Sequence, residues 1–480
     1  MAPGRIILCA DIGTSSLKAG LISTQGEGIS FVRRAYPAEA AAAGTVNTGH
    51  WEAAFKSAVC RLFTENPGLI PSALCISGNG PTFIPITAKG EVLTPLYWYG
   101  AGAPIPGGAG PDSLPSLFLP HAAAFMRNRP AEYEASRYLF SSQEWFSYRL
   151  GADPVTILPS PAYEKYYWDD EQCRLYGLDR EKFPVFAELG SPIGTVSSEA
   201  ARSFGLPEGL PIIGGGPDFI MALIGAGAIE EGLVCDRAGS SEGINVCARV
   251  PAESGELRSL PHIREGFWNV SAMIPSSGRL FEWFRVITGQ DGRDYESLME
   301  EISAVSGSAP VPSASSFGGF RSFMGEGVFY PDISCSGKYT APSVFISAAG
   351  LTSRAELGRA VVEAIAYSVK GALQTLEENG FPVREMRISG GQAKSHVWNQ
   401  WKADITGCVL HIPEISDGEL AGGACLAMTA MKEASDLRDA CRKAVHIGKT
   451  YFPNEDRNEF YSRRFGEYRD FCAKLGAFFA

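Results

Sequence analysis

The sequence of 480 residues has few of the features that mark metal-binding, secreted or membrane proteins. It contains 11 cysteines and only 6 histidines, with no Cys-x-x-Cys pair and no spacing typical of a zinc site. It has no apolar run of membrane-spanning length, and its first predicted strand begins by residue 5 with no signal peptide before it. Scattered cysteines of this kind are typical of reduced thiols inside a cytosolic protein. The sequence therefore predicts a cytoplasmic protein with no membrane partner.

An excess of positive charge is also absent. Lysine and arginine number 42 against 53 aspartates and glutamates, which gives a formal net charge of −11. This balance argues against a surface for nucleic acid or anionic lipid. The negative net charge does not argue against nucleotide binding, because backbone dipoles and Mg²⁺ bind the phosphates locally.

Two common nucleotide-binding fingerprints are missing. Gly448-Lys449-Thr450 looks like the end of a P-loop, but Lys443 stands where the upstream glycine is required. The glycines of residues 214–227 form no Gly-x-Gly-x-x-Gly, so an α/β oxidoreductase has no cofactor fingerprint here. What is present, 45% hydrophobic and 20% charged residues, is typical of a globular chain with two domains at this length.

Two glycine-rich turns, about half the chain apart, follow the same pattern. The apolar run 6–10 ends in Asp11 and then Gly13-Thr14-Ser15, and the apolar run 233–235 leads into Gly239-Ser240. A strand, such a turn and a returning strand form a hairpin whose backbone N–H groups and hydroxyls can surround phosphate oxygens. Ordinary turn chemistry explains either turn alone. The repetition favours phosphate binding.

This duplication resembles the actin-like sugar kinase and Hsp70 ATPase superfamily, and within it the FGGY carbohydrate kinases, over nearly the whole chain. Residues 211–218 resemble the family's catalytic turn, residues 387–395 its adenosine-site turn, and residues 421–424 its late small-residue helix. The layout is closest to the xylulokinase-like branch. The resemblance implies an α/β fold of two actin-like (ribonuclease H-like) domains with an interdomain cleft. We place these domains at 1–240 and 241–480.

Sequence patterns also predict individual elements. An antiparallel meander is expected up to about residue 35. The other expected elements are a helix at 51–62, a buried strand at 73–76, a helical block at 120–150, and helices at 353–378 and about 394–406. The segment 193–210 resembles the family's short helix before the catalytic strand. Residues 100–115 and 306–319 are expected to form irregular loops because they are rich in Gly, Pro and Ser.

Asp218 is the predicted general base. Phosphoryl transfer to an alcohol needs a carboxylate within hydrogen-bond reach of the attacking hydroxyl. A turn after a buried strand places this side chain at the strand's carboxyl end, where binding sites form in α/β sheets. The alternative is that Asp218 only caps the following helix.

The resemblance assigns the cofactors ATP and Mg²⁺ to the two hairpins and the late turn. The phosphates are assigned to Gly13, Thr14, Ser15, Gly239 and Ser240, the Mg²⁺ contact to Asp11, and the adenosine to Gly390, Gly391 and Gln392. Lys18 either reaches the phosphates or is an exposed hairpin lysine. Residues 421–423 either form the other side of the purine slot or serve close helix packing. Residues 276–278 resemble a further family position near the nucleotide.

The sugar site departs from the family pattern at three places. Residues 78–82 replace the usual Gly-Gln-Met-His, residues 98–100 lack the carboxylate of Trp-x-Asp, and residues 142–145 replace Pro-Lys-Asp-Tyr. The sugar contacts predicted from these positions are Asn79, Thr82, Trp98 and Glu144.

Two functional interpretations follow. The first is an ATP-dependent carbohydrate kinase acting on a hydroxyl of a small ketose or polyol. The second is a nucleotide-binding regulatory protein or degenerate kinase homologue with a weakened sugar site. The kinase is favoured because a pure binding protein has no need of a general base. The resemblance also allows a homodimer.

Overall fold

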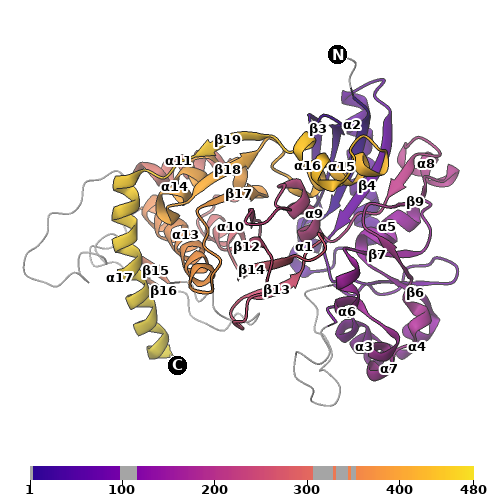
Figure 1. The fold of residues 1–480 in the computed structure, drawn as a ribbon, viewed down its shortest axis with the longest axis horizontal. Helices are drawn as coiled ribbons and strands as arrows, with labels where there is room; N and C mark the ends of the chain where they lie inside the picture. Colours follow the sequence, from indigo (N-terminus) through magenta and orange to yellow (C-terminus); the bar gives the residue numbers. More distant parts are fainter. Residues whose placement is uncertain (1–3, 98–115, 306–327, 331–343, 347–352, 480) are drawn as a thin grey trace, which may run out of the picture. The chain divides into compact units, whose positions relative to one another are not determined.

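The computed structural model describes residues 4–97, 116–305, 328–330, 344–346 and 353–479 (Figure 1). The chain forms two compact units. Unit 1 comprises Met1–Glu230, Leu260–Phe267 and Asp417–His446, and unit 2 comprises Glu231–Ser259, Trp268–Ser416 and Ile447–Ala480. This division differs from a single cut after residue 240, because two later segments fold with unit 1.

Unit 1 contains a six-stranded sheet with strand order β3-β2-β1-β4-β10-β9. The strands are β1 (Ile6–Ile12), β2 (Ser16–Ser23), β3 (Gly28–Ala35), β4 (Pro71–Gly78), β9 (Pro192–Thr195) and β10 (Pro211–Ile213). The first three strands form the predicted antiparallel meander. β4 runs parallel to both β1 and β10, so the carboxyl ends of these three strands lie at one edge.

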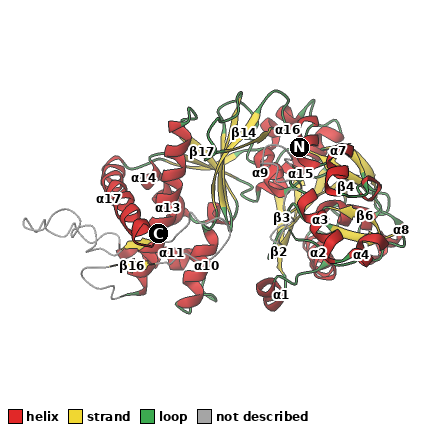
Figure 2. Ribbon diagram, turned by 90° about the horizontal axis from the view of Figure 1, so that it is seen from below, coloured by secondary structure: helices red, strands yellow, loops and turns green. Residues whose placement is uncertain are grey.

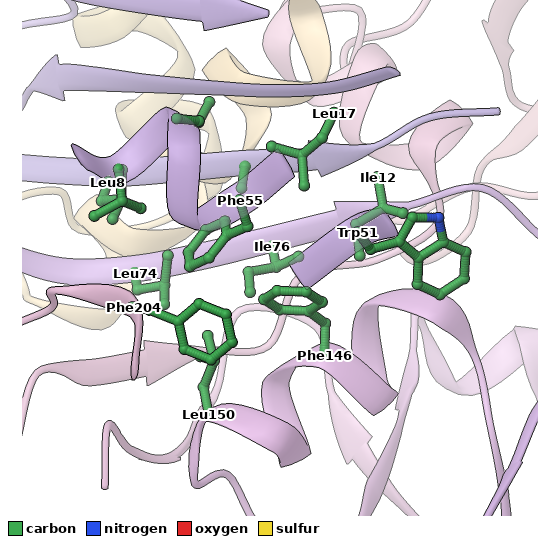
Figure 3. Close-up of a cluster of buried hydrophobic side chains, with 14 of the residues drawn as sticks. Leu8, Ile12, Leu17, Trp51, Phe55, Leu74, Ile76, Phe146, Leu150 and Phe204 are labelled. Carbon is green, nitrogen blue, oxygen red and sulfur yellow. The ribbon is translucent and has the colours of Figure 1, made fainter. Parts of the chain in front are cut away.

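Alternation along β1 assigns its residues to two faces of the sheet. Leu8 and Ile12 face a core formed with helices α2 (Thr48–Glu65), α5 (Ser142–Leu150) and α8 (Ser198–Phe204) (Figure 3). Figure 3 shows Phe55 of α2 beside Phe146 of α5, with their ring centroids 5.0 Å apart, and Trp51 of α2 belongs to the same core. α2 is amphipathic, since its buried residues recur at helical spacing, and the Asn47 side chain caps it by accepting from the His50 N–H.

The opposite face carries two helices, α9 (Asp218–Gly225) and α15 (Gly418–Ala430), and α15 is rich in small residues. A Cβ on Gly423 would lie 3.2 Å from the Cys9 sulfur of β1. A Cβ on Gly225 would lie 1.9 Å from the Gly418 carbonyl oxygen, and one on Gly422 would lie 2.1 Å from that of Met221. The two helices therefore pack backbone against backbone, and this packing joins residues 417–446 to unit 1.

The rest of unit 1 consists of short elements. They are α1 (Ala38–Ala43), β5 (Ile84–Thr87), α3 (Leu119–Asn128), α4 (Pro130–Ala135), β6 (Ser136–Phe140), β7 (Val155–Leu158), α6 (Glu164–Tyr167), α7 (Asp170–Tyr176), β8 (Val185–Glu188) and α16 (Leu437–Ala444). The prediction of one helical block over 120–150 was wrong. Pro130 begins a new helix, and the aromatic-rich segment 136–140 pairs with β5 as a strand.

Unit 2 repeats the arrangement with a seven-stranded sheet of order β13-β14-β12-β11-β17-β18-β19. The strands are β11 (Val234–Ala238), β12 (Glu242–Ala248), β13 (Arg258–Pro261), β14 (Trp268–Ile274), β17 (Glu385–Ser389), β18 (Val409–Pro413) and β19 (Ile447–Tyr451). β11 and β12 form the second predicted hairpin, and β17 runs parallel to both β11 and β18. The strands β14-β12-β11-β17-β18 therefore have the same parallel and antiparallel pairings as β3-β2-β1-β4-β10 of unit 1.

The helices of unit 2 are α10 (Gly278–Ile287), α11 (Tyr295–Ala304), α13 (Arg354–Glu378), α14 (His396–Thr406) and α17 (Glu455–Phe479), with the small hairpin β15 (Val328–Tyr330) and β16 (Val344–Ile346). α13 and α14 lie against the sheet, and the other three helices pack on them (Figure 2). The predicted helix 353–378 is confirmed, with Ser353 and Glu356 forming a capping box at its start. The loops predicted at 100–115 and 306–319 lie outside the described residues. Among the helices that the structure describes, none is long and apolar enough to cross a membrane.

The backbone contact between α9 and α15 predicts a stability effect. Gly422→Ala places a methyl group against the Met221 carbonyl, so we expect the free energy of unfolding to fall by about 2 kcal/mol or more. Gly466→Ala, in α17 where a Cβ meets no atom within 4 Å, should leave stability unchanged or raise it by up to about 1 kcal/mol. Urea unfolding of both variants measures the difference. Equal midpoints would contradict the proposed packing.

Candidate active site

Asp218 lies where three parallel strands of unit 1 end. The chain leaves β10 through residues 214–217, and a Cβ on Gly215 would lie 2.0 Å from the Ile76 carbonyl oxygen of β4. Glycine is therefore required for the chain to pass β4 at this distance. Asp218 is the first residue of α9, and the helix N-cap is Pro217, with no side-chain capping bond. The alternative that Asp218 is the N-cap is not the arrangement in the structure.

Asp11 lies at the same edge, at the end of β1. It is buried and accepts a hydrogen bond of 2.8 Å from the Ser77 hydroxyl of β4. Burial, then the charge of Glu419, raise the pKa of Asp11 to about 7, and the charge of Asp218 adds to this, while Lys18 acts in the opposite direction. Asp11 and Asp218 are thus close enough for their charges to interact. A carboxylate perturbed in this way is typical of a functional site.

Lys18 stands opposite Asp11 in the antiparallel pairing of β1 and β2. Its ammonium lies 3.3 Å from the Asp417 carboxylate, 3.4 Å from Glu419 and 3.8 Å from Asp11. Burial alone lowers the pKa of Lys18, but the charges of Glu419, Asp11 and Asp417 outweigh it and hold this pKa above its ordinary value. Lys18 is therefore held among carboxylates and is not an exposed hairpin lysine. Asp417 and Glu419 were not predicted from the sequence, because they lie about 400 residues from their partner.

The first turn is accessible at its tip. The Gly13 N–H donates to the Ser16 carbonyl at 3.1 Å, which closes the turn. Thr14 and Ser15 are exposed, so their hydroxyls and N–H groups face solvent or a ligand.

The second turn, in unit 2, is fixed by the start of α10. The N–H of Gly278 donates to the Gly239 carbonyl at 3.1 Å, and that of Arg279 donates to the Ser240 carbonyl at 3.0 Å. A Cβ on Gly278 would lie 2.4 Å from the Gly239 oxygen, so glycine is needed there as well. Ser240 remains exposed at the tip of the turn.

The predicted adenosine turn lies beside this hairpin. Gly390 follows β17 with φ of 100°, and a Cβ on it would lie 2.7 Å from the Ala238 carbonyl oxygen at the end of β11. Both the positive φ and the close approach require glycine. Gly391 is exposed, and Gln392 is buried with its Nε2 donating to the Ser277 hydroxyl at 2.6 Å. The structure thus brings the turn 239–241 and residues 390–392 together.

A buried ion cluster underlies these two turns and was also missed from the sequence. Lys402 of α14 is fully buried, with its ammonium 2.8 Å from the Asp236 carboxylate and paired with Glu242. Burial, then the charge of Glu242, raise the pKa of Asp236 to about 8. The sequence signal that could have indicated the cluster is a lysine at a core position of an amphipathic helix.

The predicted sugar contacts take varied positions in unit 1. Asn79 and Thr82 are buried, and the Thr82 hydroxyl donates to the Asn79 side-chain oxygen at 3.1 Å. Glu144 accepts from the Ser141 N–H and hydroxyl with one oxygen and from the Ile157 N–H with the other. Burial raises the pKa of Glu144 to about 7. Glu144 therefore caps its helix, and both of its carboxylate oxygens accept hydrogen bonds from the protein. Trp98 lies outside the described residues.

The small residues 421–423 are explained by helix packing. They lie within α15, are buried, and belong to unit 1, whereas residues 390–392 belong to unit 2. Close packing of α15 against α9 and β1 accounts for these small residues.

No metal cluster is preformed among the residues that the structure describes. Within them, no three His, Cys, Asp or Glu side chains are grouped as metal ligands. A Mg²⁺ ion that keeps most of its waters and is held by one carboxylate together with substrate phosphates needs no such group. Asp11, an acidic oxygen donor at the strand ends, fits that mode of binding.

Comparison with known proteins identifies the family. The model of the FGGY family of carbohydrate kinases, C-terminal domain, matches residues 237–431, and that of the N-terminal domain matches residues 163–225. Together the two models cover more than half of the chain. The chain therefore belongs to the FGGY family of carbohydrate kinases, which are enzymes that phosphorylate sugars.

The individual relatives are distant. A probable L-xylulose kinase of Haemophilus influenzae is 23% identical over 384 residues, which is 76% of this chain and 74% of that protein. An autoinducer-2 kinase of Enterobacter sp. is 24% identical over 364 residues, 72% of this chain and 66% of that protein. An L-fuculokinase of Salmonella typhi is 28% identical over 287 residues, 58% of this chain and 55% of that protein.

Solved structures of kinases share the fold. Ligand-bound xylulose kinase from Lactobacillus acidophilus has a TM-score of 0.74 at 19% identity, covering 98% of this chain and 99% of that one. Plasmodium falciparum glycerol kinase with ADP has a TM-score of 0.73 at 14% identity, covering 97% and 98%. The predicted fold class, α/β with two actin-like domains, is confirmed.

The acidic surroundings of Lys18 predict a pH-dependent variant. Lys18→Met leaves Asp11, Asp417 and Glu419 without their cation, so we expect it to destabilise the protein by about 3 kcal/mol at pH 8. The loss should be smaller at pH 5. Below its pKa of about 7, Asp11 takes up a proton and no longer needs the cation.

Urea unfolding of Lys18→Met at the two pH values measures this. The control is Arg61→Met, which removes an exposed pair with Glu65 and should cost less than about 1 kcal/mol at both pH values. A destabilisation of Lys18→Met that is the same at pH 5 and pH 8 would contradict the assignment of Lys18 as the counter-ion of Asp11.

Proposed function

We propose that this protein is an ATP-dependent kinase that transfers the γ-phosphoryl group to a hydroxyl of a small ketose or polyol. The observation that carries the proposal is the position of Asp218 at the carboxyl ends of β1, β4 and β10, close enough to Asp11 for their charges to interact. A base and a metal-binding carboxylate are the two acidic groups that phosphoryl transfer to an alcohol requires.

Asp218 accepts the proton of the attacking hydroxyl as the new O–P bond forms. Its place in the first turn of α9 favours the ionised form, because the helix dipole is positive there. The glycines before it allow the backbone to reach this position beside β4.

The turns of the two hairpins, one in each unit, bind the phosphates of the nucleotide. The exposed tips of the hairpins, Thr14 and Ser15 in unit 1 and Ser240 in unit 2, offer hydroxyls and N–H groups to phosphate oxygens. Gly390, Gly391 and Gln392 accommodate the adenosine. Asp11 would hold a hydrated Mg²⁺, which when bound neutralises charge on the phosphates.

The acceptor site suits an uncharged, hydroxyl-rich molecule. Asn79 and Thr82 provide an amide and a hydroxyl beside the end of β4, and both Glu144 oxygens already accept from the protein. We therefore propose that hydroxyl groups of the acceptor are recognised mainly by neutral polar groups. The relatives' names provide L-xylulose, L-fuculose and xylulose as candidate acceptors.

A second candidate is a nucleotide-binding protein with little kinase activity. It is favoured by the missing carboxylate at residues 98–100 and by the capping task of Glu144. The two candidates differ in one measurable property, which is the appearance of a phosphorylated acceptor.

A phosphorylation screen with purified protein and MgATP tests the proposal. The panel contains D-xylulose, L-xylulose, L-fuculose and linear polyols, with ADP release and sugar phosphate both measured. We expect one less common ketose or polyol to be preferred, and D-xylulose to have a kcat/KM below about 10⁴ M⁻¹s⁻¹. Efficient turnover of D-xylulose would show that the altered positions 79–82 and 98–100 were misinterpreted. Nucleotide binding without any phosphorylated product would favour the second candidate.

The role of Asp218 predicts a specific kinetic effect. Asp218→Asn keeps the shape of the side chain but cannot accept the proton, so kcat should fall by roughly 10²–10⁴-fold while the Kd for MgADP stays within about threefold. The matched control is Asp170→Asn, another aspartate in the first turn of a unit 1 helix, which should keep wild-type kcat. An Asp218→Asn variant that retains more than about a tenth of wild-type kcat would remove Asp218 from the role of base.

A further inference from the structure

A lysine without contact to water lies beneath the proposed nucleotide turns. Lys402 is 1% exposed, its ammonium pairs with Asp236 and Glu242, and the Trp398 ring lies 5.8 Å away, one turn earlier on α14. Removing three charged groups from water is expensive, and apolar residues of similar size often give equal or greater stability. Stability alone is therefore a poor explanation of this cluster.

The cluster continues as a directed chain of hydrogen bonds. One oxygen of Glu242 is taken by Lys402, and the other accepts the hydroxyl proton of Ser277. A serine hydroxyl has only one proton to donate, so toward its other neighbour Ser277 must act as acceptor. That neighbour is the Gln392 side-chain amide, which donates from Nε2 at 2.6 Å. The chain thus determines which end of the Gln392 amide points toward Ser277.

Ser277 takes part in this series of hydrogen bonds and does not cap its own helix. Ser277 occupies the N-cap position of α10, where a serine side chain ordinarily accepts from the helix N–H groups. It makes no such capping bond, and its hydroxyl is directed to Glu242 instead. The next two residues, 278 and 279, donate their N–H groups to the carbonyls of Gly239 and Ser240. The same segment therefore contacts both proposed nucleotide-binding turns.

We propose that Lys402, Glu242 and Ser277 are positioning residues for nucleotide binding, which fix the orientation of the Gln392 amide beside the turn 239–241. The remaining amide oxygen of Gln392 is buried and has no partner among the described residues, so it is an acceptor for a nucleotide group that donates a hydrogen bond. This inference rests on the proposed function, which places a nucleotide against Gly390, Gly391 and Gln392.

Asp236 completes the charge balance of the cluster. Burial, then the charge of Glu242, raise its pKa to about 8. The two oxygens of Glu242 accept separately, one from Lys402 and the other from Ser277.

The test uses Ser277→Ala, which interrupts the chain and leaves every charge of the cluster in place. In the full-length protein we expect its Kd for MgADP, measured by calorimetry, to rise about tenfold, the value for a lost hydrogen bond of average to charged strength. Its melting temperature should lie below that of Ser271→Ala, because Glu242 and Gln392 both lose a buried hydrogen-bond partner. Ser271 is a buried serine of β14 whose hydroxyl donates to the Arg258 carbonyl at 3.3 Å, outside the chain, and its variant should keep the wild-type Kd.

A double-mutant cycle separates positioning from general support. If Ser277 acts through Gln392, then Gln392→Ala should also weaken MgADP binding, and adding Ser277→Ala to it should change the Kd by less than about twofold. Losses that multiply in the double variant would overturn the inference, as would a Ser277→Ala Kd within about twofold of wild type. If the wild-type protein itself does not bind MgADP, the proposed function fails and the inference with it, so the two failures are distinguishable.

Discussion

The parallel pairing of each hairpin strand with a later strand decides where the site residues lie. In unit 1, β1 pairs with β4 so that Asp11 lies opposite Ser77, and the chain from β10 reaches the same edge at Asp218. In unit 2, β11 pairs with β17 so that Gly390 follows beside Ala238. Residues that are far apart in the sequence become neighbours because the carboxyl ends of parallel strands lie at the same edge of the sheet. Glycine is needed where these segments cross, because a Cβ atom there would collide with a carbonyl oxygen of the neighbouring strand.

The two units handle buried charge in different ways. Beside the first hairpin, the partly exposed Lys18 faces three carboxylates. Burial, then the charge of Glu419, raise the pKa of Asp11 to about 7 although Lys18 acts in the opposite direction. Beside the second hairpin, Lys402 is sealed inside and its partner Glu242 directs a hydrogen-bond chain toward the surface turn. The first arrangement suits chemistry with a metal ion and a proton acceptor. The second suits ligand binding, because it orients a side chain of the binding site without any group there changing its charge.

Local pattern is sufficient for much of the fold and for the turns that carry the candidate site residues. The hairpins, the capped helix after Ser353 and the glycine turn before Asp218 each have a signal within a few residues, and the structure contains all of them. The strand at 136–140 was missed because tertiary pairing with β5 overrides a helical pattern. Lys402 and Asp417 were missed because their roles come from partners more than 100 residues away.

We propose that the turns 239–241 and 390–392 of unit 2 hold the adenosine diphosphate part of the donor. The most direct measurement is the position of ADP in a crystal structure of the full chain with MgADP. We expect phosphate oxygens at Gly239 and Ser240, the adenosine against Gly390 and Gly391, and a hydrogen bond to the Gln392 side-chain oxygen. ADP bound elsewhere in the molecule, or bound here with Gln392 turned away and its hydrogen bond to Ser277 broken, would contradict it.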